Sequence, residues 1–315
     1  MSLAEFGDED SAFLSTFQNV FDVRKVGRNL VRSDGRHTGG GYRSGRLYGG
    51  HTAAQIHLAF RCLHPNFVIH TLRVNFVAPG NVKDALDYEF TEIPGGEFQI
   101  ANVTQNKKRI ASAKIRFGLS NELLDQSPYF MPQVNSPLSY PTFYNSIKQL
   151  QNENVAQTLE NLMNKKLFEM RPVDVEQVIF TKHSWEPMRI WCSLNPMYKG
   201  GLQPQITHIR SSLESISPRD GISVVVLLSD YMVIHPARSR YVQFGRSREF
   251  GDAASLNHTV WFHVVEDIDP DGWFLYESSC TRISNTRPLI EARIFDQRGR
   301  CLISTVQEAY INAKI

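Results

Sequence analysis

The chain has 315 residues, enough for one large or two medium domains with a sizeable hydrophobic core. Hydrophobic residues make up 42% of it and charged residues 21%, which is typical of a folded globular protein rather than a disordered or membrane-embedded one. The formal net charge of +2 is too small, and the Lys and Arg residues are too dispersed, to favour nucleic-acid binding.

Targeting and cysteine patterns narrow the setting further. The longest apolar run, residues 224–228, is far too short to cross a bilayer, and residues 1–6 include an acidic residue and no apolar core. We therefore expect neither membrane insertion nor a secretory signal. The four cysteines lack C-x-x-C spacing, which predicts reduced thiols in an intracellular compartment and no zinc site or disulfide framework: Cys62, Cys192, Cys280 and Cys301.

The first half of the chain reads as one helix followed by strands. Gly49-Gly50-His51 opens an apolar, Ala-rich stretch, Thr52–Phe60, with helical character. A polar turn at residues 105–108 precedes the last strand of this half, which alternates apolar and polar residues. The expected strands cover about Val68–Val77, Ala85–Ile93, Phe98–Asn102 and Arg109–Phe117.

The second half repeats this order. Gly221 opens an apolar segment that runs through Leu228 to Ile234. Its β-branched residues alone favour a strand, so the prediction of a helix rests on the repeat. A polar, basic turn at residues 296–300 again precedes the last strand. The expected strands cover about Ser255–Val265, Trp273–Ile283, Leu289–Phe295 and Cys301–Ile311.

A helix followed by antiparallel strands is the element order of the hot-dog fold, a curved sheet wrapped round one helix. Two copies predict an α+β double hot-dog, with two antiparallel sheets each wrapped round a central helix. We expect an N-terminal hot-dog domain over residues 1–118, a linker over 119–166 and a C-terminal hot-dog domain over 167–315. The linker combines a Pro-rich loop with one helix within residues 147–168.

Several segments together resemble the type II acyl-CoA thioesterases of bacteria and peroxisomes. Arg46–His51 resembles the aromatic-Gly-Gly-Gln entry to that family's first helix, and Asn75–Gly80 resembles its strand end Phe-x-x-Pro-Gly. Ser229-Asp230-Tyr231 lies where the family often has Ser-Asp in its second helix. The strongest likeness is to the family's active-site strands, in Ala254–His263, Tyr276–Thr281 and Ser304–Glu308.

In that family an Asp, a Thr or Ser, and a Gln hold the water that cleaves the thioester. The resemblance places three residues of this chain in those roles: Asn257, Thr281 and Gln307. An oxyanion hole is expected from backbone N–H groups at the start of the first helix, at Gly49, Gly50 and His51.

Residue 257 is decisive for this expectation. The amide of Asn257 can orient a water molecule, but it cannot take the proton of that water at neutral pH. Reduced turnover is therefore expected unless another group acts as the base. The groups near in sequence are His258, Asp230 and Glu308, and alternation along the strand puts His258 on the opposite face from Asn257.

The first half serves as an internal control for the site. Aligning Val74 with Val260 puts Thr71 opposite Asn257, and no matching set of polar side chains is found in the first half. We therefore expect one site per chain, built mainly from the second half and capped by the helix of the first half.

The leading functional interpretation is an acyl-CoA thioesterase that releases a free fatty acid and CoA, weakened by Asn257. Two alternatives stay open: a non-catalytic acyl-CoA-binding paralogue, and a hot-dog enoyl-CoA hydratase. No motif implies a cofactor. A metal is not expected either, because His258 and His263 lack an acidic or Cys partner at ligand spacing.

The expected fold suggests how the chain associates, and its C-terminal residues suggest where in the cell it is located. Curved sheets of this type commonly pair, so a homodimer or higher homo-oligomer is expected. The residues Ala313-Lys314-Ile315 are similar to the Ser-Lys-Leu address, which predicts a peroxisomal location through the import receptor, and otherwise a cytoplasmic one.

Overall fold

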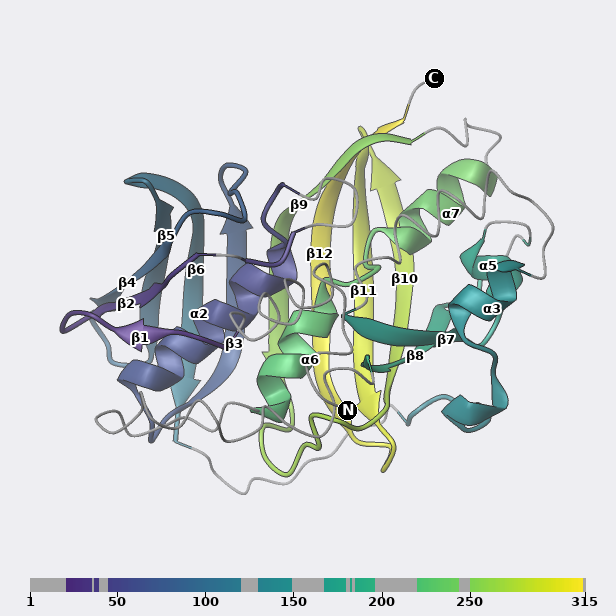
Figure 1. The fold of residues 1–315 in the computed structure, drawn as a ribbon, viewed down its shortest axis with the longest axis horizontal. Helices are drawn as coiled ribbons and strands as arrows, with labels where there is room; N and C mark the ends of the chain where they lie inside the picture. Colours follow the sequence, from purple (N-terminus) through teal and green to yellow (C-terminus); the bar gives the residue numbers. More distant parts are fainter. Residues whose placement is uncertain are drawn as a thin grey trace, which may run out of the picture.

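The computed structural model describes residues 21–35, 37–39, 45–119, 130–148, 167–179, 182, 185–195, 220–243 and 250–313. Within these residues, strands from both halves of the chain form one antiparallel sheet of 12 strands (Figure 1). Their order is β1-β2-β4-β5-β6-β3-β9-β12-β11-β10-β8-β7.

The strands of the first half are β1 (Arg24–Lys25), β2 (Leu30–Ser33), β3 (Val68–Phe76), β4 (Leu86–Ile93), β5 (Phe98–Gln105) and β6 (Lys108–Gly118). The strands of the second half are β7 (Phe168–Pro172), β8 (Met188–Leu194), β9 (Phe250–Phe262), β10 (Phe274–Ser284), β11 (Arg287–Asp296) and β12 (Cys301–Ala313). The described helices are α2 (Gly49–Leu63), α3 (Phe143–Lys148), α5 (Val175–Val178), α6 (Gly221–Ser229) and α7 (His235–Gln243), with a 3₁₀ turn η2 (Pro137–Ser139).

The sheet has an internal two-fold pattern about the β3–β9 pair. Reading outward from β3 gives β6, β5, β4 and β2, and reading outward from β9 gives β12, β11, β10 and β8. The double hot-dog prediction is confirmed, and β3 and β9 join its two sheets edge to edge. Domain boundaries at 118 and 167 stay a prediction, because most of the linker lies outside the described residues.

The two hot-dog helices lie side by side on the same face of the sheet (Figure 1). The segment Gly221–Ser229 is a helix despite its β-branched residues, because its fully buried side chains pack against α2 and against β11 and β12. Helices of this kind are stabilised by tertiary burial rather than by propensity. One hydrophobic core includes residues of both halves, from Val31 to Ile303.

The opposite face of the sheet carries a second apolar layer in the C-terminal half. Trp191, Leu275 and Phe295 lie side by side on β8, β10 and β11 and form one buried cluster. Part of the linker covers this cluster, and the indole Nε1 of Trp191 donates to the Asn135 carbonyl over 3.0 Å. The helix expected within residues 147–168 falls almost wholly outside the described residues, whereas α3 ends at Lys148.

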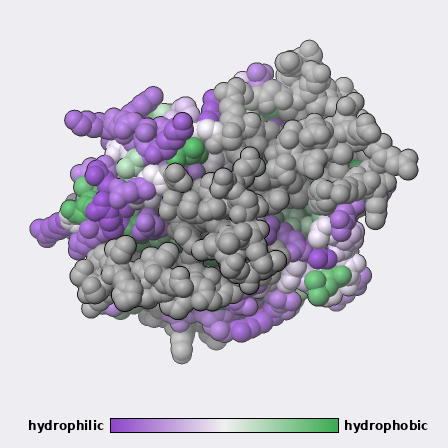
Figure 2. Space-filling model, in the orientation of Figure 1, coloured by the Kyte–Doolittle hydropathy of each residue, from purple (hydrophilic) through white to green (hydrophobic). Residues whose placement is uncertain are grey.

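The surface seen in Figure 2 is mainly hydrophilic where it is coloured, and its apolar areas are small and separate. No helix of the described chain is long and apolar enough to cross a membrane. The C-terminal residues Lys314 and Ile315 lie outside the described residues, so the peroxisomal address stays a prediction.

A tight turn between β10 and β11 offers a test of the fold. Asn285 and Thr286 connect the strands with positive φ angles of 49° and 61°. Glycine favours this conformation, whereas a β-branched side chain is strained in it. We predict that Thr286→Gly raises the free energy of unfolding by about 1 kcal/mol. Urea denaturation checks this, with Thr286→Ala as the control that keeps the strain; equal effects of both variants would contradict the explanation.

Candidate active site

Asp230 is the centre of a buried polar cluster where four elements meet. It directly follows α6 and is only 8% exposed. One carboxylate oxygen, Oδ1, accepts hydrogen bonds from Gln307 Nε2 over 2.7 Å and from Ser255 Oγ over 3.0 Å. The other, Oδ2, accepts from the backbone N–H of Gly50 over 2.9 Å. Gln307 Nε2 also donates to Ser255 Oγ, so carboxylate, hydroxyl and amide contact one another.

The start of α2 lies against this carboxylate because two glycines allow a close approach. A Cβ atom on Gly49 would lie 2.6 Å from Asp230 Oδ2, and one on Gly50 would lie 2.6 Å from the Leu227 carbonyl oxygen. Tyr48, the residue before α2, donates its hydroxyl to the same Leu227 carbonyl over 2.8 Å. No side chain of α2 itself caps the helix, so Asp230 caps it from the other half of the chain.

A β-bulge brings Ser255 to the inner face of the sheet. In the β9–β12 ladder Asn257 pairs with Glu308 and Ser255 pairs with Ala309, which leaves Leu256 as the extra residue. One extra residue reverses the alternation of side chains. Ser255 therefore shares a face with Gln307, whereas Asn257 does not.

Asn257 lies on the outer face, and the expected grouping of Asn257 with Gln307 is corrected by this register. Its Nδ2 donates to Glu308 Oε2 over 3.1 Å, and its Oδ1 accepts from the Glu308 backbone N–H over 3.3 Å. The resemblance alone assigned Asn257 to the site, and its pairing with Glu308, next to the inward-facing Gln307, sets its side chain on the outer face. His258, expected on the face opposite to Asn257, is indeed buried on the inner face opposite Gln307.

Thr281 is also outside the cluster. It is the extra residue of a bulge in β10, it is exposed, and its Oγ1 donates to the Leu289 carbonyl over 3.3 Å. Strand β11 separates β10 from β12, so Thr281 and Gln307 are not on neighbouring strands. Of the three side chains predicted for catalysis, only Gln307 belongs to the Asp230 cluster.

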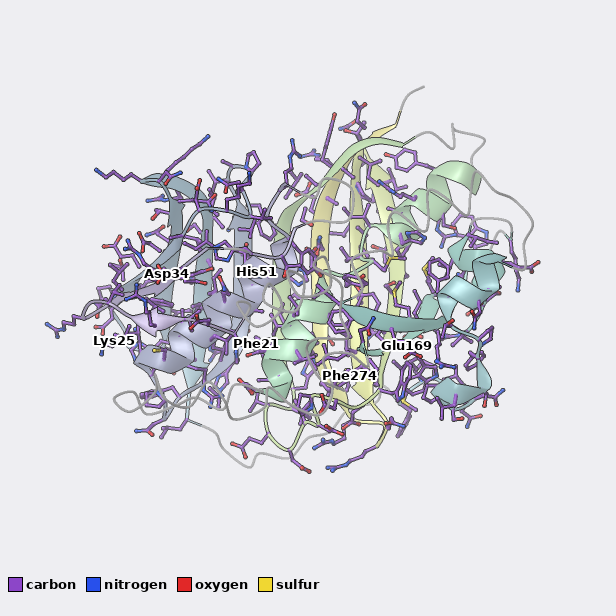
Figure 3. All side chains as sticks on the ribbon, in the orientation of Figure 1. Phe21, Lys25, Asp34, His51, Glu169 and Phe274 are labelled. Atoms are coloured by element: carbon purple, nitrogen blue, oxygen red, sulfur yellow. The ribbon has the colours of Figure 1, made fainter. Side chains whose placement is uncertain are left out.

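Of the predicted oxyanion-hole residues, Gly49 and Gly50 lie at the cluster and the His51 side chain points away from it. The Thr38 N–H donates to His51 Nδ1 over 3.4 Å, which places the His51 proton on Nε2, 3.1 Å from His37 Nδ1. His37 Nε2 then donates to the Asp84 carbonyl over 3.0 Å. Burial lowers the pKa of both imidazoles, so this chain of bonds holds them neutral. Figure 3 labels His51 at the end of α2 that is nearer to α6.

Burial and hydrogen bonding act in opposite directions on Asp230. Desolvation raises its pKa above the ordinary value, and this effect outweighs the lowering by nearby His258 and by the hydrogen bonds from Gln307, Ser255 and Gly50. A carboxylate with a raised pKa is a better proton acceptor than an exposed one. The arrangement is therefore suited to general-base chemistry beside a helix start that can stabilise negative charge.

The sequence held a signal for Asp230 but only a weak one for Ser255. Asp230 is one of the candidate bases near Asn257, and Ser229-Asp230 resembles the family's Ser-Asp pair. Ser255 lay within the matched strand, yet nothing in the sequence marks Leu256 as the residue of a bulge. The polar set could thus be placed on the right elements, but not on the right strand face.

Comparison with known proteins agrees with this geometry. The family model "Acyl-CoA thioesterase C-terminal domain" matches residues 189–311, which include Asp230, Ser255 and Gln307. Acyl-coenzyme A thioesterase 8 of Homo sapiens is 23% identical over 313 residues, covering 98% of this chain and 91% of that protein. Over almost its whole length the chain is similar to the type II acyl-CoA thioesterases.

Solved structures show the same fold. Acyl-CoA thioesterase II TesB2 from Mycobacterium marinum superposes with a TM-score of 0.65 at 17% identity, covering 94% of this chain and 98% of that one. A hot-dog fold protein from Alicyclobacillus acidocaldarius gives a TM-score of 0.68 at 18% identity, covering 95% and 98%. The double hot-dog fold is therefore shared along almost the whole length of this chain.

Among the described residues of the first half, no counterpart of the Asp230 cluster is found. Strand β3 carries a bulge at His70 that matches the bulge at Leu256, because Thr71 pairs with Arg116 and Ile69 with Phe117. This register puts buried apolar residues at the places of the polar ones: Ile69 for Ser255, Leu72 for His258 and Ile115 for Gln307. Among the described residues, no group of three or more His, Cys, Asp or Glu side chains could hold a metal ion.

The position of Asn257 leads to a first functional prediction. We expect that Asn257→Asp does not raise the rate of thioester hydrolysis, because the new carboxylate would lie beside Glu308 on the outer face. CoA release followed with a thiol reagent measures this. Thr281→Ala, on a bulge away from the cluster, serves as a control with unchanged rate. A tenfold gain for Asn257→Asp would show that residue 257 reaches the reacting water after all.

Proposed function

We propose that the protein hydrolyses acyl-CoA thioesters to a free fatty acid and CoA at the Asp230 cluster. The observation that carries this proposal is the contact of one buried carboxylate with Ser255, Gln307 and the start of α2. Similarity to the acyl-CoA thioesterases supports the same reaction class.

In the proposed reaction Asp230 takes a proton from a water molecule whose oxygen attacks the thioester carbonyl carbon. Ser255 and Gln307 hold the carboxylate in one orientation and offer further hydrogen bonds to the water. The carbonyl oxygen becomes an oxyanion beside the start of α2, where the first N–H groups of a helix have no partner within it. Collapse of the intermediate breaks the C–S bond, and the leaving thiolate receives the proton from Asp230.

The placement of Asn257 and Asp230 does not favour the binding-only alternative. That alternative depended on an amide in place of the catalytic carboxylate, but Asn257 is on the outer face and Asp230 supplies a carboxylate. A hydratase stays without support, since no Asp and His pair from one loop is found at this cluster in the described residues.

Two further properties are proposed from sequence and fold. We expect a homodimer or higher homo-oligomer, and recognition of Ala313-Lys314-Ile315 by the peroxisomal import receptor. The support is the open edge and face typical of curved sheets and the likeness of the tail to Ser-Lys-Leu. Measuring the mass in solution tests the first property, and comparing the cellular location with and without the last three residues tests the second.

The central test removes the proposed base. We predict that Asp230→Asn lowers kcat by a factor on the order of a hundred to ten thousand, because general-base catalysis typically contributes that much. The fold should persist, since the amide keeps the volume of the carboxylate. CoA release and thermal unfolding measure both quantities. Glu308→Gln changes a carboxylate on the outer face and is the matched control; similar losses for both variants would argue against Asp230 as the base.

The pKa of Asp230 predicts an acid limb in the pH profile. Asp230 acts as a base only when ionised, so kcat/KM falls as the pH falls through its pKa, which burial raises above 3.8. Ser255→Ala removes a hydrogen bond that lowers this pKa, and the acid limb should therefore move to higher pH. Initial rates from pH 4 to 9 check the shift. An acid limb at the same pH in both proteins would assign it to another group.

A further inference from the structure

His258 contacts the cluster from a side that the proposed mechanism does not use. It is fully buried on β9, directly opposite Gln307 on β12. Its Nε2 lies 2.7 Å from Oγ of Ser229, the residue before Asp230. The imidazole thus lies between Gln307 and the end of α6, which carries Asp230.

Two residues that pair across β9 and β12, His258 and Gln307, each have one buried side-chain atom without a hydrogen-bond partner. Gln307 Nε2 is committed to Asp230 Oδ1 and Ser255 Oγ, which directs Gln307 Oε1 away from the carboxylate. Among the described residues, neither Gln307 Oε1 nor His258 Nδ1 has a hydrogen-bond partner of good geometry. Buried polar atoms are rarely left this way, so one proton is expected between them.

The position of the imidazole proton decides whether both atoms are satisfied. Burial lowers the pKa of His258, so the ring is neutral and has a single N–H. A proton on Nε2 would point to Ser229 and leave two acceptors, Nδ1 and Gln307 Oε1, facing each other. A proton on Nδ1 can be donated to Gln307 Oε1 instead.

Ser229 can complete this second arrangement. Its hydroxyl oxygen lies 2.8 Å from the Val226 carbonyl and 2.7 Å from His258 Nε2, and its one proton can be donated to either. When the Ser229 hydroxyl donates its proton to His258 Nε2, and His258 Nδ1–H donates to Gln307 Oε1, all three side chains have a hydrogen-bond partner.

We propose that His258 is a positioning residue whose Nδ1–H holds Gln307 Oε1 and thereby keeps the Gln307 amide group directed at Asp230 and Ser255. Without this bond the Gln307 amide can turn over, which would place its oxygen beside the carboxylate. The inference rests on the proposed function for its kinetic consequence, but the tautomer of His258 can be observed without any turnover.

The kinetic test compares two conservative variants. His258→Asn places an amide N–H near the position of Nδ1, whereas His258→Gln reaches toward Ser229 and loses that donor. We expect kcat to fall on the order of tenfold or more for His258→Gln, with little change in KM, and to stay much closer to wild type for His258→Asn. Equal losses in both variants at unchanged thermal stability would overturn the proposal.

A double-mutant cycle tests whether His258 acts through Gln307. In a Gln307→Ala background the orientation of an amide no longer matters, so His258→Gln should have no further effect on kcat. An additional loss as large as in the wild-type background would overturn the positioning role, because His258 would then act independently of Gln307.

The tautomer itself is measured by ¹⁵N NMR of the imidazole nitrogens in the full chain, with His258 assigned by its absence in His258→Asn. We expect the Nδ1–H form in the wild type and a change toward Nε2–H in Gln307→Leu. An Nε2–H form in the wild type would overturn the proposal even if turnover is normal. Absent turnover with an Nδ1–H form would instead contradict the proposed function and leave the hydrogen bond established.

Discussion

The pairing of β3 with β9 is the constraint on which the rest of the molecule depends. It joins two curved sheets into one and fixes the register between them, with Val74 opposite His258 and Asn75 opposite Asn257. Since each half carries its helix on the same face of the sheet, this register sets α2 beside α6. The start of one helix then meets the end of the other, and the Asp230 carboxylate bonds to the backbone of Gly50 across the two halves. The cluster therefore requires both halves, although almost all its side chains come from the second.

The close approach of the two helices gives the site its electrostatic character. Side chains larger than hydrogen at Gly49 and Gly50 would separate α2 from the carboxylate and from Leu227. The same closeness excludes solvent from Asp230 and raises its pKa, while the helix start and the donors from Ser255 and Gln307 limit that rise. A buried carboxylate is thus kept ionisable and also basic. Opposing effects of this kind are common where a protein needs a proton acceptor near neutral pH.

The sequence predicted most of the fold because its signals were local and repeated. Alternation located the strands, and the repeat identified α6 as a helix against the preference of its β-branched residues. The site was predicted less completely: Gln307 and the glycine pair belong to the cluster, but Asn257 and Thr281 do not. Thr281 is the extra residue of one bulge and Asn257 is adjacent to another, and a bulge changes which face the neighbouring side chains occupy. Bulges arise from strand pairing between distant segments, and that pairing has no mark in the local sequence. Ser255 could be assigned only once its partner Ala309 was known.

The bulge at Leu256 has a consequence beyond the choice of residue 255. Ser255 and His258 are three residues apart, so in a regular strand their side chains would lie on opposite faces. The extra residue, Leu256, reverses the alternation between them, and both side chains therefore lie on the inner face and contact the end of α6. The first half has the same irregularity at His70, yet it places the apolar Ile69 and Leu72 where the second half has Ser255 and His258. The bulge is therefore common to both hot-dog units of this chain. At these matched positions the two copies differ in their side chains, which are apolar in the first half and polar in the second.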